Sequence, residues 1–226
     1  MLANIRASLE TNRAALAAIA ASAPHTPPPF VHPPQDDLAA QFASELARLD
    51  GYPHRCADDE DALETIREIL QAHQATSAIA WDAEQIGLPG IEALLSSIGV
   101  TALDGRIAYA EDRAERLQIL EPAPVCISGA NVAIAESATL VVLSGPGRGR
   151  LASLLAPVYI GVVRTSQLVR GLGEALAVVQ AQHGRDIFRD QSNLTLITGP
   201  SRTADIELTL TLGVHGPREI HVVLIG

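Results

Sequence analysis

Residues 157–182 read PVYIGVVRTSQLVRGLGEALAVVQAQ, and this stretch decides the fold class. Its first seven residues form a continuous apolar run, which is typical of a strand buried on both faces. Residues 165–182 then predict a long helix that begins at Thr165 or Ser166. A buried strand followed by a helix is the unit from which parallel sheets are built, so we expect an α/β protein.

The same alternation of strands and helices extends along most of the chain. Short apolar runs predict strands at residues 77–81, 106–110, 157–163, 194–198 and 219–225, with a further pair within 124–145. Helical spacing predicts helices at 37–49, 60–73, 88–99, 111–121 and 203–214. Continuous apolar strands interleaved with helices indicate a mainly parallel sheet that is covered on both faces.

Residues 1–35 are expected to form an N-terminal arm outside the main domain, which spans residues 36–226. Aliphatic side chains recur at helical spacing over residues 2–22, and charged residues interrupt the run, so we predict an amphipathic helix rather than a signal peptide. Five prolines within residues 25–34 favour an extended connector. The apolar stripe needs a partner, either the chain's own domain or another subunit in a homo-oligomer.

Charge and composition exclude several classes of function. The net charge is −10, which opposes a broad nucleic-acid-binding face. All 16 basic residues are Arg, so a Schiff-base, phosphate-binding or general-base lysine is excluded, while Arg remains available for carboxylate or phosphate. No apolar run reaches the ~18 residues of a membrane span, so we expect a cytoplasmic protein without a membrane partner.

Cofactor chemistry is not indicated by the sequence. Cys56 and Cys126 are the only cysteines, and an iron–sulfur cluster takes about four ligands. We expect two reduced, partly buried thiols, with a disulfide or redox pair as the alternative. Histidines and acids show no metal-ligand spacing, and no dinucleotide fingerprint follows a strand, so we predict neither a metal nor a cofactor.

The strongest candidate site is the segment TGPSRTAD, residues 198–205. A strand ends there, Gly-Pro turns the chain, and Ser201 or Thr203 can cap the predicted helix. Free backbone N–H groups at a helix start, at the carboxyl end of a parallel strand, bind anions. We therefore assign ligand binding to Gly199, Ser201, Arg202, Thr203 and Asp205. The alternative is an ordinary capped helix with a surface arginine.

Two further candidates carry ionisable groups. His215 lies between Gly213 and Gly216, which allow close backbone approach and to which we also assign ligand binding. We consider His215 as an acid/base or anion contact, with a loop histidine as the alternative. His221, inside the last predicted strand, is interpreted as structural. Glu136 lies between two apolar runs; if buried and paired it could serve as nucleophile or base, and otherwise it is a solvated turn residue.

The turn GPGRGR, residues 145–150, alternates glycine with Arg148 and Arg150. It could wrap an anion or contact an acidic partner, and a flexible surface turn fits equally well. Together with Glu136 and residues 194–218, these arginines are proposed to form the walls of one pocket.

Four segments resemble the LUD domain of the LutC/YkgG family: SGANVAIAESATLVV, GPGRGRLASLLAPVYIGVV, ITGPSRTADIE and GVHGPREIHVVLI, in order over residues 126–226. The resemblance implies a three-layer α/β/α fold related to the NagB/RpiA/CoA-transferase group. It also implies a role in L-lactate oxidation beside iron–sulfur subunits. Two positions depart from the family pattern: Ala138 stands where a glycine is usual, and Tyr159 where histidine is usual.

Two functions follow as hypotheses. The first is an accessory or regulatory, non-redox component of lactate oxidation that binds a small carboxylate or phosphate and docks on iron–sulfur partners. The second is a stand-alone acyl- or CoA-transferase-like enzyme in which Glu136 is the nucleophile, by analogy with the related transferases, and Arg202 and His215 hold the substrate.

Overall fold

A computed structural model describes residues 2–22, 33, 35–107, 112–184, 187–204 and 210–226. Most of the proline-rich connector, the middle of the helix predicted at 203–214 and the candidate residue Asp205 lie outside the described residues. No helix in these ranges is both long enough and apolar enough to span a membrane.

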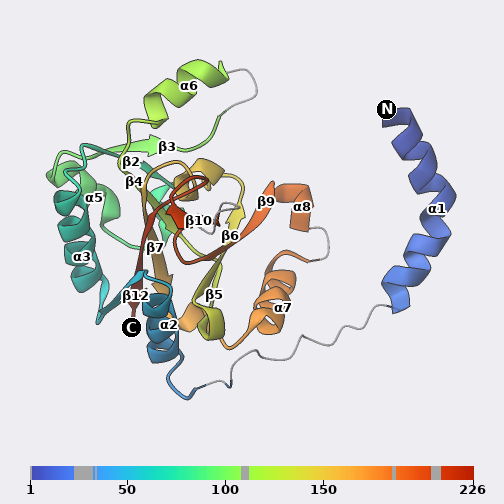
Figure 1. The fold of residues 1–226 in the computed structure, drawn as a ribbon, viewed down its shortest axis with the longest axis horizontal. Coiled ribbons are helices and arrows are strands. Elements are labelled where there is room, and N and C mark those ends of the chain that lie inside the picture. The colour runs from blue at the N-terminus through green and yellow to red at the C-terminus, as the bar shows by residue number, and fades with distance from the viewer. Residues whose placement is uncertain (1, 23–32, 34, 108–111, 185–186, 205–209) are drawn as a thin grey trace.

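A six-stranded sheet forms the centre of the fold (Figure 1), and every neighbouring pair of its strands is parallel. In spatial order the strands are β1 (Tyr52–Cys56), β12 (Glu219–Ile225), β7 (Val158–Arg164), β4 (Val125–Gly129), β2 (Ser77–Ala80) and β3 (Thr101–Asp104). Strand β4 is buried throughout, as are β7 and β12 apart from one terminal residue each. The predicted mainly parallel α/β fold is therefore confirmed.

Helices cover both faces of this sheet. Their bounds are α2 (Leu38–Arg48), α3 (Asp59–Ala72), α4 (Ala83–Ile86), α5 (Ile91–Ser97), α6 (Arg113–Leu120), α7 (Leu172–His183) and α8 (Ile187–Asp190). Helix α3 packs on β1 and β12 and contacts α5, which lies beside it in Figure 1. Asp37 and Asp58 cap α2 and α3 by accepting backbone N–H groups of Ala40 and Asp61, which satisfies donors that a helix start leaves free.

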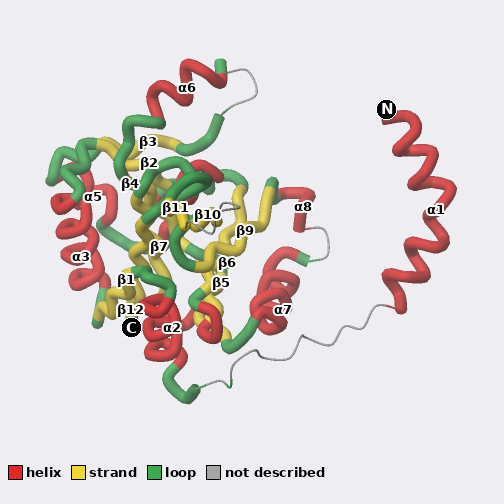
Figure 2. Tube along the Cα trace, in the orientation of Figure 1, coloured by secondary structure: helices red, strands yellow, loops and turns green. Residues whose placement is uncertain are grey.

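A second sheet lies against the central one (Figure 2). It orders β8 (Leu168–Val169), β5 (Val132–Ile134), β6 (Thr139–Ser144) and β9 (Asn193–Thr198), and its β5–β6 and β6–β9 pairs are antiparallel. The packing is close, because a Cβ atom on Gly161 of β7 would lie 2.5 Å from Leu140 Cδ1 of β6. Its other side is covered by Ala175 and Val179 of α7.

The prediction of a helix at residues 203–214 is wrong. The described parts of this segment are strands β10 (Arg202–Ala204) and β11 (Leu210–Leu212), paired antiparallel. The signal was present in ELTLTL, where leucine and threonine alternate with the period of a strand. Strand β9 exists as predicted, but it belongs to the antiparallel sheet rather than to the parallel one.

Two other element predictions are also wrong in part. The helix expected over 165–182 begins only at Leu172, since Gly171 is its N-cap residue and a 3-10 turn and β8 precede it. A strand was also predicted at residues 106–110. Arg106 and Ile107 instead follow the end of β3, and residues 108–110 are outside the described ranges. Strand β1 was not predicted, because YPHRC carries little apolar character.

The N-terminal segment contains the expected helix α1 (Leu2–Ser22). Its apolar stripe is exposed: Leu2, Ile5, Leu9 and Leu16 keep about half or more of their surface open. The division of the chain at residue 35 and the partner of this helix stay predictions.

Candidate functional site

A cavity of about 770 Å³ opens at the carboxyl ends of β2 and β3, where the loop of residues 145–150 folds over them. Four arginines line it: Arg106, Arg113, Arg148 and Arg150. The carboxyl edge of a parallel sheet is where α/β proteins commonly bind their ligands. The structure therefore brings the two arginines singled out in the sequence together with two that were not.

Glycines hold the loop close to the sheet. Asp82 N–H donates to Gly147 O at 2.9 Å, and the Trp81 indole Nε1–H donates to Gly149 O at 3.2 Å. A Cβ on Gly149 would lie 2.6 Å from the carbonyl carbon of Gly105, and Gly147 has a φ of +68°, so larger residues are disfavoured at both positions. The GPGRGR turn is thus a packed structure rather than a flexible surface turn.

The four guanidinium groups differ in how far they are already paired. Arg106 is bound to Asp104 at 2.8 Å and lies 3.7 Å from Asp82. The Asp104 hydrogen bond and charge raise the pKa of Arg106. Arg113 and Arg150 are exposed. Among the described residues, the cavity lining contains four arginines and no carboxylate, and only Arg106 of the four forms an ion pair, so this lining carries positive charge within a chain whose net charge is −10.

Arg148 is the most enclosed of the four. One of its terminal NH₂ groups donates to Gln191 Oε1 at 2.8 Å, and its guanidinium lies 6.0 Å from the centre of the Trp81 ring. Its Nε is buried and lacks a hydrogen-bond partner among the described residues. Burial lowers the pKa of Arg148, but an arginine stays charged at neutral pH. Arg67 Nε and Arg116 Nε share this property, but of the three side chains only that of Arg148 lines the cavity.

Glu136 is also buried, with 5% of its surface exposed, in the 3-10 turn Ala135–Ser137. Next to it the Thr139 hydroxyl lies 2.8 Å from Ser137 Oγ and 2.6 Å from Thr198 Oγ1. The motifs AESAT and TGPS, distant in sequence, therefore meet where β6 pairs with β9. The interpretation of Glu136 as a solvated turn residue is wrong.

Glu136 and the arginines do not share a pocket. Glu136 precedes the first residue of β6, and Arg148 follows its last residue. A strand of six residues is about 17 Å long, so the two groups lie at opposite ends of it. The single pocket proposed from the sequence, with Glu136 and the two arginines as its walls, is wrong.

The segment that was predicted to bind an anion at a helix start forms hydrogen bonds within the protein instead. Ser201 N–H donates to Pro217 O at 2.7 Å, and Gly213 N–H donates to Ser201 O at 2.9 Å. Arg202 pairs with Asp50 at 2.6 Å and also donates to the Leu49 carbonyl.

Because the helix is absent, ligand binding by Gly199, Ser201, Arg202, Thr203, Gly213 and Gly216 loses its structural basis and stays an untested prediction. His215 is exposed on the loop before β12, and its assigned chemistry is likewise untested.

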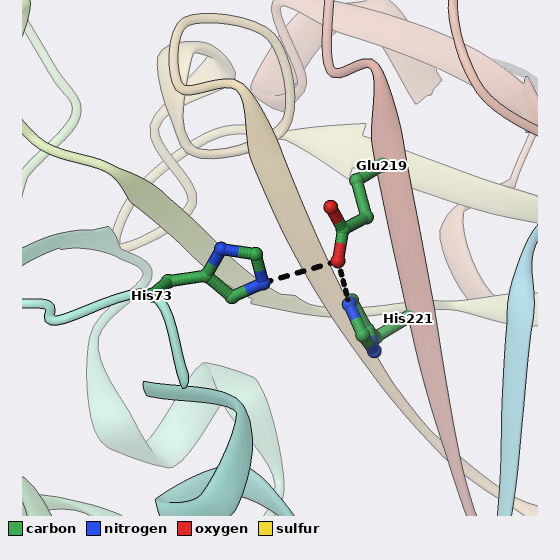
Figure 3. A group of neighbouring side chains, drawn as sticks. All are labelled: His73, Glu219 and His221. Carbon is green, nitrogen blue, oxygen red and sulfur yellow. Dashed lines mark hydrogen bonds and ion pairs between the residues drawn. The ribbon is translucent and has the colours of Figure 1, made fainter. Parts of the chain in front are cut away.

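A histidine cluster was missed by the sequence analysis (Figure 3). Glu219 Oε1 lies 3.0 Å from His73 Nε2 and 2.8 Å from His221 Nε2, and His221 Nδ1 lies 2.9 Å from His54 Nε2. Tyr52 stacks on the His221 ring. The alternation of Glu219 and His221 on one face of a strand was the available signal, but His73 is 146 residues away from Glu219.

The cluster lies at the amino edge of the sheet, on the face that α3 covers. Burial lowers the pKa of His54 and of His221, although the hydrogen bond to Glu219 acts in the opposite direction on His221. Burial would raise the pKa of Glu219, but hydrogen bonds and charge from His221 and His73 outweigh it and leave that pKa lowered. Burial thus disfavours the protonated forms of His54 and His221, and the lowered pKa of Glu219 favours its ionised form.

Tyr159 marks a departure from the family pattern. Its side chain is fully buried, and its hydroxyl lies 2.7 Å from Ser128 Oγ. Burial raises the pKa of the phenol well above its usual range, so it stays neutral. A core tyrosine with a satisfied hydroxyl is a structural residue here.

Fold and cavity define an α/β protein with an arginine-lined cavity at the carboxyl ends of its parallel strands. The family model described as LUD domain matches residues 39–225, and the chain belongs to this family.

Relatives include the lactate utilization protein C of Macrococcus caseolyticus, 36% identical over 68% of this chain and 63% of that one. That of Geobacillus sp. strain WCH70 is 32% identical over 84% and 79%. A crystal structure of a DUF162 family protein from Deinococcus radiodurans superposes with a TM-score of 0.58 at 25% identity, covering 84% of this chain and 96% of the other.

Proposed function

We propose that this protein acts in lactate utilization as a non-redox accessory or regulatory subunit that binds a small carboxylate, such as lactate or pyruvate, in the arginine-lined cavity. The names of the relatives support the physiological setting. The observation that carries the ligand class is the gathering of Arg106, Arg113, Arg148 and Arg150 around one cavity.

The chemistry of the cavity favours a planar anion. A guanidinium group binds a carboxylate through two parallel N–H···O bonds, and such charge-assisted bonds are about twice as strong as neutral ones. Arg148 offers a buried Nε–H that still lacks an acceptor, and Arg150 is exposed. Inorganic phosphate shares this chemistry, so binding tests must compare the two ions directly.

Electron transfer is assigned to partner chains. Both cysteines are free and buried. Burial raises the pKa of Cys126 to about 11 and also raises that of Cys56, so neither thiol ionises readily to the thiolate that binds a cluster. We therefore propose docking on iron–sulfur subunits, tested by co-purification of the full chain from cells grown on lactate; absence of any iron–sulfur protein would count against this part.

The test of the carboxylate site is a thermal-shift and calorimetric titration with L-lactate, pyruvate, phosphate and CoA. A ligand at 100 times its Kd stabilises the fold by about 2.7 kcal/mol, which raises the Tm of a chain of this size by about 5–10 °C. Arg148→Ala should weaken lactate binding about 10- to 100-fold, the loss expected for a charged hydrogen bond. Arg148→Lys should recover only part, because a lysine lacks the two-pronged geometry.

Two matched variants separate the candidate sites. Arg48→Ala removes one exposed surface charge and should leave the Kd unchanged. Arg202→Ala tests the site first predicted from the sequence. It too should leave the Kd for lactate unchanged, because Arg202 already forms an ion pair with Asp50. No response to any of the four ligands, or loss of binding only in Arg202→Ala, would refute the cavity as the binding site.

The acyl-transferase hypothesis finds less support. Glu136 is 5% exposed, which leaves little access for a thioester, and the arginines lie at the far end of β6. Incubation with acyl-CoA followed by trapping at Glu136 decides the matter. We expect no thioester, and a Glu136→Gln chain should bind lactate as the unmodified chain does.

A further inference from the structure

The cluster of His73, Glu219 and His221 is assembled from separate parts of the fold. Glu219 and His221 are on the same face of β12, and His73 is the C-cap residue of α3, which packs over that strand. Figure 3 shows the two imidazoles pointing at the same carboxylate oxygen of Glu219. Two nitrogen atoms and one oxygen atom that can each bind a metal ion thus lie close together.

The distances fit a metal ion. One ligand atom from each residue lies within 4.8 Å of the others. Around a tetrahedral Zn²⁺ with bonds of about 2.0–2.1 Å, neighbouring ligand atoms are about 3.3 Å apart. The two contacts of 2.8 and 3.0 Å would open by a few tenths of an ångström, and the separation of the His73 and His221 nitrogens, which is at most 4.8 Å, would close by up to about 1.5 Å through side-chain rotation. To bind the ion through Nε2, each neutral imidazole would carry its proton on Nδ1 instead, where that of His221 can be donated to His54 Nε2.

The surroundings provide orientation and access. A metal-binding histidine usually donates its second ring N–H to a neighbouring group, and His221 Nδ1 lies 2.9 Å from His54 Nε2. Tyr52 stacks on the same ring with centroids 4.8 Å apart. The side chains of His73 and Glu219 are 26% and 27% exposed, so an ion can enter and further positions are open to water or another ligand.

We propose that His73, Glu219 and His221 form a binding site for a divalent transition-metal ion of the Zn²⁺ type, with His54 as a positioning residue. Two imidazoles and one carboxylate suit Zn²⁺ and its first-row neighbours, whereas Mg²⁺ and Ca²⁺ prefer oxygen ligands. The site is separate from the arginine-lined cavity and does not depend on the proposed function.

The experiment uses the untagged full chain after treatment with a chelator. Zn²⁺ is titrated by calorimetry, and Co²⁺ is followed by visible absorption, where a four- or five-coordinate ion gives intense d–d bands. We expect one ion per chain, and at least 10-fold weaker binding in His73→Gln and in Glu219→Gln. His73 is partly exposed at a helix end, so its substitution leaves the core intact.

Two controls make the result specific. His183→Gln changes a histidine in the last turn of α7 and should leave binding unchanged. His54→Gln retains the three ligands and should weaken binding about 10- to 100-fold, the usual effect of losing a group that orients a ligand. Binding that persists in both His73→Gln and Glu219→Gln, a thiolate-to-cobalt band from Cys56, or no binding by the unmodified chain would overturn the proposal.

Discussion

Ala138 is one of three described non-glycine residues with a positive φ, together with Asp50 and Gln74. It has a φ of +48° at the end of the turn that holds Glu136, and only 1% of its surface is exposed. The left-handed conformation is the one that glycine adopts most readily, which agrees with the glycine that the resemblance to the LUD domain led us to expect at this position. A non-glycine residue there costs about 1–2 kcal/mol.

We expect Ala138→Gly to change the free energy of unfolding by less than about 1 kcal/mol. The relief of the left-handed conformation offsets the loss of a buried methyl group and the larger entropy of the unfolded chain. Ala135→Gly is the matched control, since Ala135 is equally buried in the same turn but has no positive φ. It should destabilise by about 1–2 kcal/mol in urea unfolding; equal losses at both positions would contradict this account.

The histidine cluster predicts a pH dependence of stability in the metal-free chain. Burial lowers the folded-state pKa of His54 and His221 below 6.5, so the unfolded chain binds protons first as the pH falls. The free energy of unfolding should therefore decrease as the pH drops below 6.5 towards the folded-state values. Glu219 adds a loss of the same sign around and below pH 4.5, because its folded-state pKa is lowered.

Urea unfolding at a series of pH values measures this effect. The slope below pH 6.5 should be smaller in His54→Gln than in the unmodified chain, and His183→Gln should retain the original slope. A stability that rises as the pH falls through this range would show that the imidazoles are charged in the folded state.

At the scale of elements, the sequence predicted the helices and strands whose apolar side chains recur with a single period. It failed where the local conformation depends on pairing with a distant segment of the chain. The buried strands β4, β7 and β12 and the capped helices α2 and α3 were predictable because their apolar patterns match their burial. Strand β1 was not predictable in this way, because Pro53, His54 and Arg55 adopt a strand conformation by pairing with β12. The β10–β11 hairpin was mistaken for a helix because its cap-like serine and threonine outweighed the alternation of ELTLTL.

Helix α1 carries a prediction of its own, since its exposed apolar stripe lacks a packed partner among the described residues. We propose that a second copy of the chain covers it. Ile5→Glu combined with Leu9→Glu should dissociate the oligomer in sedimentation experiments. Ala7→Glu combined with Thr11→Glu adds the same charge at the same spacing on the opposite side of the helix, and it should not. A monomeric unmodified chain would refute the proposal.

At the scale of the whole molecule, both candidate sites depend on contacts that sequence spacing does not reveal. Arg148 and Arg150 could be singled out from the glycine-rich loop, but Arg106 and Arg113 join them only because β3 ends beside that loop. Likewise His221 was interpreted as structural, and its cluster depends on α3 ending above β12. What the sequence could indicate was the chemistry available, while the topology decided which groups meet.

The two sites lie at opposite edges of the parallel sheet, and this arrangement predicts that their ligands act independently. The arginine-lined cavity is at the carboxyl ends of β2 and β3, whereas the histidine cluster is towards the amino ends of β1 and β12. These two pairs of strands are at opposite ends of the strand order of the sheet. Each ligand at 100 times its Kd should stabilise the fold by about 2.7 kcal/mol. Without shared contacts, the two increments should add to within about 0.5 kcal/mol.

Urea unfolding with lactate, with Zn²⁺ held by a metal buffer, and with both together measures this sum. Arg148→Ala should reduce the lactate increment to about 0.4–1.4 kcal/mol and preserve that of Zn²⁺, and His73→Gln should do the reverse. An excess of more than about 1 kcal/mol in the doubly bound chain would mean that the sites are coupled, because distant independent sites do not deviate that far. In that case lactate would have to stabilise the metal-bound arrangement of α3 and β12 from across the sheet, and Zn²⁺ would tighten lactate binding by the same factor by which lactate tightens Zn²⁺ binding.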